Sequence, residues 1–233
     1  MSGKLFLIPA TIGDTETDRV IPEYVKETVA RIKHYIVENE RSARRMLIKL
    51  GIPTPIDELT FYILDEHTDK ASISQFLEHI NDGDIGLLSE AGVPCVADPG
   101  SEIVALAHAR NIKVIPLVGP SSILLSIMAS GLNGQNFAFN GYLPVKGPDR
   151  IQKLKLLENR SRLEKQAQLF IEAPYRNNQL VNDIITACSE HTRLCIASEI
   201  STKDEFIATQ TIGYWKKHLP ELHKKTVIFI IQA

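Results

Sequence analysis

The chain has 233 residues, with 26 Lys and Arg against 28 Asp and Glu, a formal net charge of −2, and 44% hydrophobic residues. This composition is typical of a folded globular protein and excludes a disordered chain. The near-neutral charge excludes a protein that coats nucleic acid by charge alone, although it leaves room for a local basic patch. No apolar run reaches the roughly 20 residues of a membrane span, and the N-terminus lacks the pattern of a signal peptide. We therefore expect a soluble cytoplasmic protein that does not associate with a membrane.

The cysteines support the same compartment. They are odd in number and far apart in the chain, at positions 95, 188 and 195. This spacing excludes a disulfide scaffold and a four-cysteine zinc site, and it favours a reducing environment.

Short apolar runs alternate with amphipathic stretches through the first half of the chain. The expected strands are 5–8, 35–37, 61–64, 85–88 and 114–117, and the expected helices are 19–32, 42–50, 73–80 and 101–110. Strands that are apolar on both sides and separated by helices indicate a parallel sheet with both faces covered. The first half therefore predicts an α/β domain.

The second half has a different pattern. It predicts helices at 123–128, 150–166 and 214–218, and strands at 137–139, 169–171, 194–197, 205–208 and 226–231. Strands joined as closely as the last three are often antiparallel, which predicts a mixed sheet. We expect two α/β domains, residues 1–117 with a parallel sheet and residues 118–233 with a mixed sheet.

Several common catalytic motifs are absent from the sequence. It contains no Gly-x-x-x-x-Gly-Lys-Ser/Thr phosphate loop, no His-Glu-x-x-His metal helix and no Gly-x-Ser-x-Gly nucleophile elbow. The histidines show no metal-ligand spacing with cysteines or carboxylates. These absences argue against P-loop and metal chemistry, and no metal site is expected.

The loop at residues 89–100, directly after the strand 85–88, is the strongest candidate for a binding site. Ligands of parallel sheets bind beyond the carboxyl ends of the strands. Gly92 and Gly100 allow close approach of the backbone to a ligand, and two prolines fix its path. Asp98 followed by Pro99 predicts a helix N-cap. The alternative is a rigid connection with no ligand.

Three further loops follow predicted strands. Residues 8–14 carry no charge next to the strand end, which favours van der Waals contact with a ligand over phosphate binding. In residues 118–122, the hydroxyls of Ser121 and Ser122 cap a helix or bind a polar group of a ligand. In residues 171–176, Glu172 and Arg176 form either a structural ion pair or part of a catalytic site.

These four loops, in this order, resemble the tetrapyrrole methylase superfamily of S-adenosylmethionine-dependent methyltransferases, and most of all its ribosomal RNA small subunit methyltransferase I branch. The resemblance extends from Leu5 to Ile231 and is most specific at 90–94 with 98–100, at 172–176 and at 199–205. The branch usually has threonine at the position of Val93, and its full-length members extend beyond the position of Ala233. A short paralogue with another substrate is therefore an alternative.

The resemblance implies two domains that hold S-adenosylmethionine in the cleft between them, as a homodimer. It implies methylation of a cytidine ribose 2′-hydroxyl in the RNA of the small ribosomal subunit. The sulfonium of this cofactor loses its charge on methyl transfer, so weak carbonyl and CH···O contacts suit it better than a strong counter-ion. The residues expected to bind it are Pro9, Gly92, Val93, Pro94, Val96, Ala97, Ser121, Ser122, Tyr142, Ala173 and Ile200.

A ribose hydroxyl is a poor nucleophile and needs a base to accept its proton. The candidate bases are Glu90, Glu172 and Glu199, with Lys203 or Arg176 to orient a phosphate, and for each carboxylate a structural role is the alternative. Residues 146–165 contain seven basic and three acidic residues, a balance of +4, and predict an RNA surface that includes Arg150 and Lys153, to which the resemblance adds Arg176. A second basic cluster is formed by Arg41, Arg44, Arg45 and Lys49.

Other functions are compatible with parts of this pattern. A methyltransferase of a small tetrapyrrole-like molecule would not need the basic segment 146–165. A non-catalytic module that binds the cofactor or RNA is compatible with the departures from the family pattern. A nicotinamide dehydrogenase fits the parallel sheet, but the Gly-x-Gly-x-x-Gly fingerprint is missing.

Overall fold

The computed structural model describes residues 3–64, 68 and 70–233. It divides into two compact units, Met1–Ser121 and Ser122–Ala233. The boundary expected between residues 117 and 118 lies four residues before this division.

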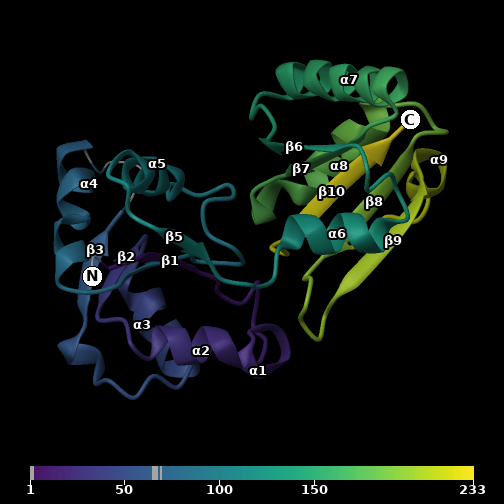
Figure 1. Ribbon diagram of the computed structural model, residues 1–233. Helices are drawn as coiled ribbons and strands as arrows, with labels where there is room; N and C mark the ends of the chain where they lie inside the picture. Colours follow the sequence, from purple (N-terminus) through teal and green to yellow (C-terminus); the bar gives the residue numbers. More distant parts are fainter. Residues whose placement is uncertain (1–2, 65–67, 69) are drawn as a thin grey trace. The chain divides into compact units, whose positions relative to one another are not determined.

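The first unit is built on a parallel sheet, as Figure 1 shows. Within the described residues its five strands have the order β3-β2-β4-β1-β5. Each neighbouring pair is parallel, which confirms the predicted architecture. All four residues of β4 are buried, as a strand between two helical layers requires. The strand bounds are β1 Leu5–Ile8, β2 His34–Val37, β3 Thr60–Ile63, β4 Ile85–Leu88 and β5 Val114–Pro116.

Helices cover both faces of this sheet. On one face, α1 (Thr17–Val20), α2 (Glu23–Val29) and α3 (Glu40–Lys49) belong to a core in which Val25 and Leu47 are fully buried with Tyr35 of β2. On the other face, α4 (Lys70–Phe76) and α5 (Ser101–Ala109) contribute to a second core with Ile36 of the same strand. Short 3₁₀ turns, η1 (Ile56–Glu58) and η2 (Glu78–Asn81), complete the connections.

The single helix expected over residues 19–32 is wrong, because the structure has two short helices there. Ile21 and Pro22 are extended between α1 and α2. Proline has no N–H to donate and disfavours helical geometry at the residue before it, so a helix that reaches Ile21 ends there.

The second unit is built on a mixed sheet with the order β6-β7-β10-β8-β9 among the described residues. β6 pairs parallel with β7, whereas β10 is antiparallel to β7 and β8, and β9 is antiparallel to β8. This confirms the predicted mixed sheet. The strand bounds are β6 Phe137–Tyr142, β7 Ala167–Ile171, β8 Arg193–Ser198, β9 Phe206–Thr211 and β10 Val227–Gln232.

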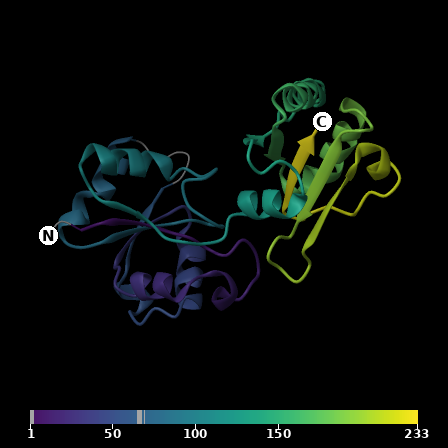
Figure 2. The same cartoon turned by 45° about the vertical axis from the view of Figure 1, so that its right-hand side comes forward.

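Helices also cover both faces of this second sheet, as Figure 1 and Figure 2 show. Helix α6 (Ser122–Ser130) packs through Ile127 on one face, in a core with Leu169 of β7. Helices α7 (Gly147–Glu164), α8 (Asn177–Ala187) and α9 (Ile212–Trp215) pack on the other face around Phe170 and Phe229. The 3₁₀ turn η3 (Pro174–Arg176) leads from β7 into α8. In the part of the chain that the structure describes, no helix is both long and apolar enough to cross a membrane.

Candidate functional site

The strand order of the first unit predicts a ligand-binding crevice at the carboxyl ends of β1 and β4. These two strands are neighbours, but the chain leaves β1 toward α1 and α2 on one face and leaves β4 toward α5 on the other. At such a switch point of a parallel sheet, ligands bind beyond the carboxyl ends of the strands. The loops that border it are residues 9–16 and 89–100.

The loops after β1, β4 and β5 touch one another at this edge. The backbone N–H of Ala10 donates a hydrogen bond to the carbonyl oxygen of Gly92 over 2.9 Å. A Cβ added to Gly119 would lie 2.2 Å from Cβ of Pro9, so only glycine allows this approach. Gly92 has a φ of +70°, and a Cβ there would lie 3.1 Å from the carbonyl oxygen of Pro120. Two of the predicted cofactor contacts, Pro9 and Gly92, therefore lie in one cluster.

Asp98 organises the long loop after β4. Its Oδ1 accepts hydrogen bonds from the backbone N–H groups of Cys95, at 2.7 Å, and Gly100, at 3.1 Å. Helix α5 begins at Ser101 with Gly100 as its N-cap, so the prediction that Asp98 caps this helix is wrong. The aspartate instead closes a turn before the helix, which is a common role of its short side chain.

The backbone of this loop is strained. Cys95 and Ala97 have φ values of 66° and 64°, in the left-handed region that favours glycine. Such conformations cost on the order of 1–3 kcal/mol and cluster at functional sites, where the surrounding structure holds them. A similar pair, Glu199 and Ser201 with φ of 51° and 68°, occurs in the turn after β8 of the second unit. Both segments were singled out in the sequence.

The surface of these loops is largely apolar. Val96 is 48% exposed and Val118 is 74% exposed. Burial raises the pKa of the Cys95 thiol to about 11, and Asp98 adds to the shift, so the thiol is neutral at pH 7. Val93 and Pro94 lie in the same loop. A ligand that binds here therefore meets backbone groups and small apolar side chains.

Carboxylates gather beside this apolar surface. Burial raises the pKa of Glu38, which follows β2, and the nearby charges of Asp98 and Glu90 raise it further. Glu90 is exposed, and its Oε1 lies 2.5 Å from the Oγ of Ser42 on α3. The carboxylate of Glu90 is thus fixed at the edge of the site and remains accessible to solvent.

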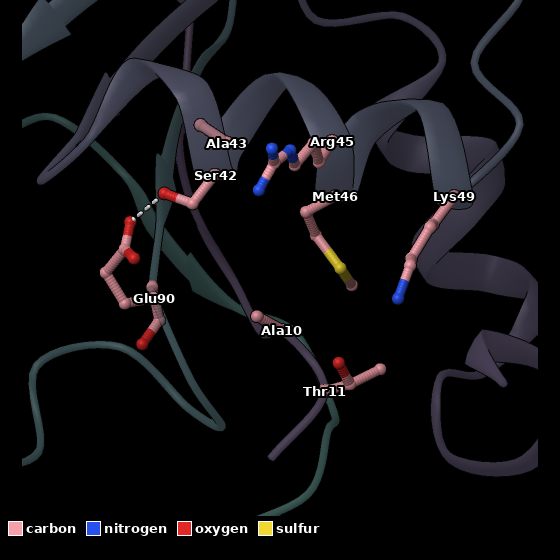
Figure 3. Close-up of a pocket in the computed structure, with 9 residues that line it drawn as sticks. Ala10, Thr11, Ser42, Ala43, Arg45, Met46, Lys49 and Glu90 are labelled. Atoms are coloured by element: carbon pink, nitrogen blue, oxygen red, sulfur yellow. Dashed lines mark hydrogen bonds between the residues drawn. The ribbon is translucent and has the colours of Figure 1, made fainter. Parts of the chain in front are cut away.

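Glu90 also borders a pocket of about 200 Å³ beneath α3, shown in Figure 3. Arg45, Met46 and Lys49 project from α3 on the side that faces Ala10 and Thr11. Asn39 caps this helix by accepting from the N–H groups of Arg41 and Ser42. The pocket is lined by Ala10, Thr11, Ser42, Ala43, Arg45, Met46, Lys49, Ser89 and Glu90.

In the second unit, several of the predicted site residues lie at one edge of the sheet. Strands β6, β7 and β8 run in the same direction, because β7 and β8 are both antiparallel to β10. Tyr142 ends β6 and is 65% exposed, while Ala173 follows β7 and Ile200 follows β8. Glu199 is held by Thr226, whose backbone N–H and Oγ1 lie 2.5 and 3.1 Å from its Oε1. Lys203 is exposed in the same turn.

Glu172 lies in a buried ion cluster at this edge. Its side chain has no exposed surface, and its Oε1 accepts from Nη2 and Nε of Arg176 at 2.6 and 2.9 Å. Its Oε2 lies 3.9 Å from Nη1 of Arg150. Arg176 also lies over the ring of Tyr175, 5.1 Å from its centre. This enclosure favours a structural role for Glu172, which fixes the turn at 173–176.

Arg150 does not lie on an RNA-facing surface, contrary to the expectation for segment 146–165. It has 0% exposure, and its Nε and Nη2 lie 2.6 and 2.5 Å from Oδ2 of Asp183. Its Nη1 donates to the carbonyl oxygen of Val145 over 2.8 Å. A buried arginine needs such partners to offset its desolvation, and its burial keeps the guanidinium out of reach of a phosphate in solution. Lys153, three residues further along α7, is only partly buried.

Sequence reasoning missed several residues that build the site. Gly119 was overlooked, although a Gly-Pro pair directly after a strand can indicate a close backbone approach. Ser42 was read only as part of a helix, and its contact with Glu90 joins residues 48 positions apart. Ser121 and Ser122 lie at the division between the two units, where α6 begins. Across residues 3–64, 68 and 70–233, no group of three or more metal-ligating side chains is found.

Comparison with curated sequences finds ribosomal RNA methyltransferases. The chain is 28% identical over 207 residues to ribosomal RNA small subunit methyltransferase I of Pseudomonas aeruginosa, covering 88% of this chain and 69% of that protein. The proteins of the same name from Haemophilus influenzae and Buchnera aphidicola are 26% and 29% identical, over 100% and 99% of this chain and 80% and 78% of theirs. No protein-family model matches the chain.

Comparison with solved structures identifies the fold. The methyltransferase CobJ has a TM-score of 0.65 at 13% identity, covering 99% of this chain and 94% of that one. Uroporphyrin-III C-methyl transferase of Thermus thermophilus, solved in complex with S-adenyl homocysteine, has a TM-score of 0.57 at 14% identity and covers 99% of this chain and 97% of that one. The chain therefore has the fold of these methyltransferases. Its curated sequence relatives include ribosomal RNA small subunit methyltransferase I proteins, which confirms the resemblance noted in the sequence.

The contact between Gly119 and Pro9 predicts that a side chain at position 119 lowers the stability of the first unit. We expect Gly119→Ala to destabilise the first unit by about 1–3 kcal/mol, because the added Cβ overpacks against the proline ring. Gly83→Ala is the control, since a Cβ at Gly83 meets nothing within 4 Å. Urea denaturation measures both, and equal losses would contradict the close approach of the two loops.

The raised pKa of Glu38 predicts a pH dependence of stability. A folded-state pKa above the unfolded value means that the folded protein holds the proton more tightly, so stability falls as pH rises through this range. We expect Glu38→Gln to raise the melting temperature at pH 7 and to lose this advantage below about pH 4.3, where the carboxyl is protonated in both states. The same change at the exposed Glu27 of α2 is the control. A Glu38→Gln advantage that is unchanged across pH would contradict the assignment.

The burial of Arg150 predicts that its loss affects folding. We expect Arg150→Met to cost about 3–5 kcal/mol of unfolding free energy, because Asp183 and Glu172 lose a buried partner. Lys153→Met on the same helix should stay within about 0.5 kcal/mol. Chemical denaturation compares the two, and a stable Arg150→Met protein would restore Arg150 as a candidate for RNA contact.

Proposed function

We propose that this protein is an S-adenosylmethionine-dependent methyltransferase that modifies the RNA of the small ribosomal subunit. The observation that carries the proposal is the similarity to ribosomal RNA small subunit methyltransferase I over 88–100% of the chain. The crevice between β1 and β4 supports it, since its loops meet at the position where this class of sheet binds ligands.

The residues at this crevice fit the cofactor. Gly92 lets the loop after β4 pass close to the carbonyl oxygen of Pro120, and the exposed side chains of Val96 and Val118 offer apolar surface on the neighbouring loops. When bound, S-adenosylmethionine supplies a methyl group from a positively charged sulfur. Backbone carbonyls hold such a charge without stabilising it strongly, which suits a group that becomes neutral on transfer. The proposed contacts in the first unit are Pro9, Gly92, Val93, Pro94, Val96 and Ala97.

In the second unit, the proposed cofactor contacts lie at or just after the carboxyl ends of β6, β7 and β8. Tyr142, Ala173 and Ile200 are retained as cofactor contacts, and Ser121 and Ser122 as polar contacts at the division between the units. Arg176 and Lys203 are proposed to meet phosphate, although Arg176 is already paired with Glu172. The exposed side chains Leu124 and Met128, 58% and 75% exposed on α6, support a homodimer as a further part of the proposal. Action on ribosomal RNA would place the protein in the cytoplasm.

Among the candidate bases, Glu90 is best placed to accept a proton from an acceptor hydroxyl. It is exposed, whereas the side chain of Glu172 is fully buried and Oε1 of Glu199 is engaged by Thr226. The hydroxyl of Ser42 orients the Glu90 carboxylate. Removing the hydroxyl proton increases the nucleophilicity of the ribose oxygen.

The first experiment identifies the acceptor. Purified protein is incubated with tritiated S-adenosylmethionine and either small ribosomal subunits, their isolated RNA, or uroporphyrinogen III. We expect label in the ribosomal RNA. Label only in the tetrapyrrole would support the small-molecule alternative, which the solved structural relatives favour. Cofactor binding with no transfer to any acceptor would support a non-catalytic module.

A matched pair of glycine variants tests the cofactor site. Gly92 and Gly51 both have positive φ, +70° and +74°, so alanine costs each about 1–2 kcal/mol of backbone strain. Only Gly92 has a neighbour close to the added Cβ. We expect Gly92→Ala to weaken S-adenosylhomocysteine binding at least tenfold in calorimetry, and Gly51→Ala to leave it within about twofold. Equal affinities would remove Gly92 from the site.

A further inference from the structure

The basic residues of α3 differ in whether their charges are paired. Arg44 is paired with Glu40 and Asp57, at 2.8 and 3.1 Å, and its guanidinium lies over the ring of Phe61. Arg45 makes no hydrogen bond or ion pair with any residue that the structure describes. Lys49 has only the fully exposed Asp14, 3.5 Å away, and such a surface pair contributes little. Two cations, one turn apart, are thus available on the same helix.

These two cations border the pocket under α3. Figure 3 shows Arg45 and Lys49 on the side of the helix that faces Thr11, with Met46 between them. Glu90 and Ser42 lie at the opposite end of the same pocket. The pocket therefore combines a carboxylate with two cations: Lys49 lies at the end away from Glu90, and Arg45 lies between Ser42 and Met46.

This arrangement fits one chemical class of ligand. A ribonucleotide carries a phosphate, which binds cations, directly beside a sugar hydroxyl, which donates to a carboxylate. We propose that the α3 pocket binds one ribonucleotide of the RNA substrate, with its phosphate on Arg45 and Lys49 and its sugar hydroxyl toward Glu90. The inference rests on the proposed function and adds a specific substrate-binding site to it.

The size of the pocket supports a piece of RNA backbone. Its volume is about 200 Å³, below the roughly 300–1,000 Å³ that drug-sized ligands occupy. A sugar and its phosphate are small enough for this space, whereas a tetrapyrrole macrocycle is not. Phosphate contacts carry no sequence information but fix the register of the RNA, so the pocket would place the acceptor hydroxyl at the carboxylate.

The test compares two double variants, each of which replaces two cations by neutral glutamines. Arg45→Gln/Lys49→Gln removes both cations of the pocket at the carboxyl edge of the sheet. Arg31→Gln/Lys33→Gln removes two exposed cations just before β2, at the opposite edge. Binding of a small-subunit ribosomal RNA transcript is measured over a range of salt concentrations, with S-adenosylhomocysteine affinity and melting temperature measured in parallel.

We expect the pocket variant to bind the transcript ten- to a hundredfold more weakly. The slope of log K against log salt should fall by about 0.7–0.9, because the variant loses the neutralisation of one phosphate. S-adenosylhomocysteine affinity and melting temperature should be unchanged. In methyl transfer KM should rise with little change in kcat, whereas Glu90→Gln should mainly lower kcat. The control variant should bind the transcript within about threefold of wild type.

The outcomes separate this inference from the proposed function. If wild type binds and methylates the RNA and the pocket variant does so equally well, the pocket inference is wrong and the proposed function stands. If the pocket and control variants lose affinity equally, overall charge explains the effect and the pocket inference is again wrong. If wild type binds S-adenosylhomocysteine but neither binds nor methylates the RNA, the proposed function fails and the pocket inference fails with it.

Discussion

The contact among the loops that follow β1, β4 and β5 is the constraint on which the site depends. Gly119 lies directly against Pro9, and Ala10 donates to the carbonyl of Gly92, so three separate connections are fixed to one another. A side chain at Gly119 would force them apart. Because the contact is made by backbone and glycine, it leaves the nearby apolar side chains and carbonyl groups free to face a ligand.

The same edge separates two kinds of chemistry. Asp98 accepts hydrogen bonds from the backbone of Cys95 and Gly100 and so fixes the loop after β4, in which Cys95 and Ala97 are left-handed. Beside it, Glu90 and the basic residues of α3 form a polar pocket. An uncharged surface for a sulfonium nucleoside next to a polar site for a nucleotide is the division that methyl transfer to RNA would require.

The buried charged residues of the second unit hold together the elements at one edge of its sheet. Arg150, Glu172, Arg176 and Asp183 come from three separate segments, and their ion pairs join α7 and α8 to the end of β7. Such a cluster is costly to break, because any lost member leaves an unpaired charge in the interior. It explains why a segment rich in lysine and arginine offers less free positive surface than its composition indicates.

The sequence alone determined the alternation of strands and helices, the parallel and mixed sheets and the loops that carry the site, because buried strands need continuous apolar runs and glycines mark close approaches. The apolar pattern predicted one helix over residues 19–32, although Pro22 in the sequence already argues for the break that the structure shows, since proline disrupts a helix that continues from Ile21. The tertiary structure alone decided which charges are free. Arg150 and Arg45 look alike in the sequence, yet one meets Asp183 across 33 positions and the other meets no described partner. Ion pairs of this kind depend on which distant segments the fold brings together, and the local sequence pattern around each arginine does not predict them.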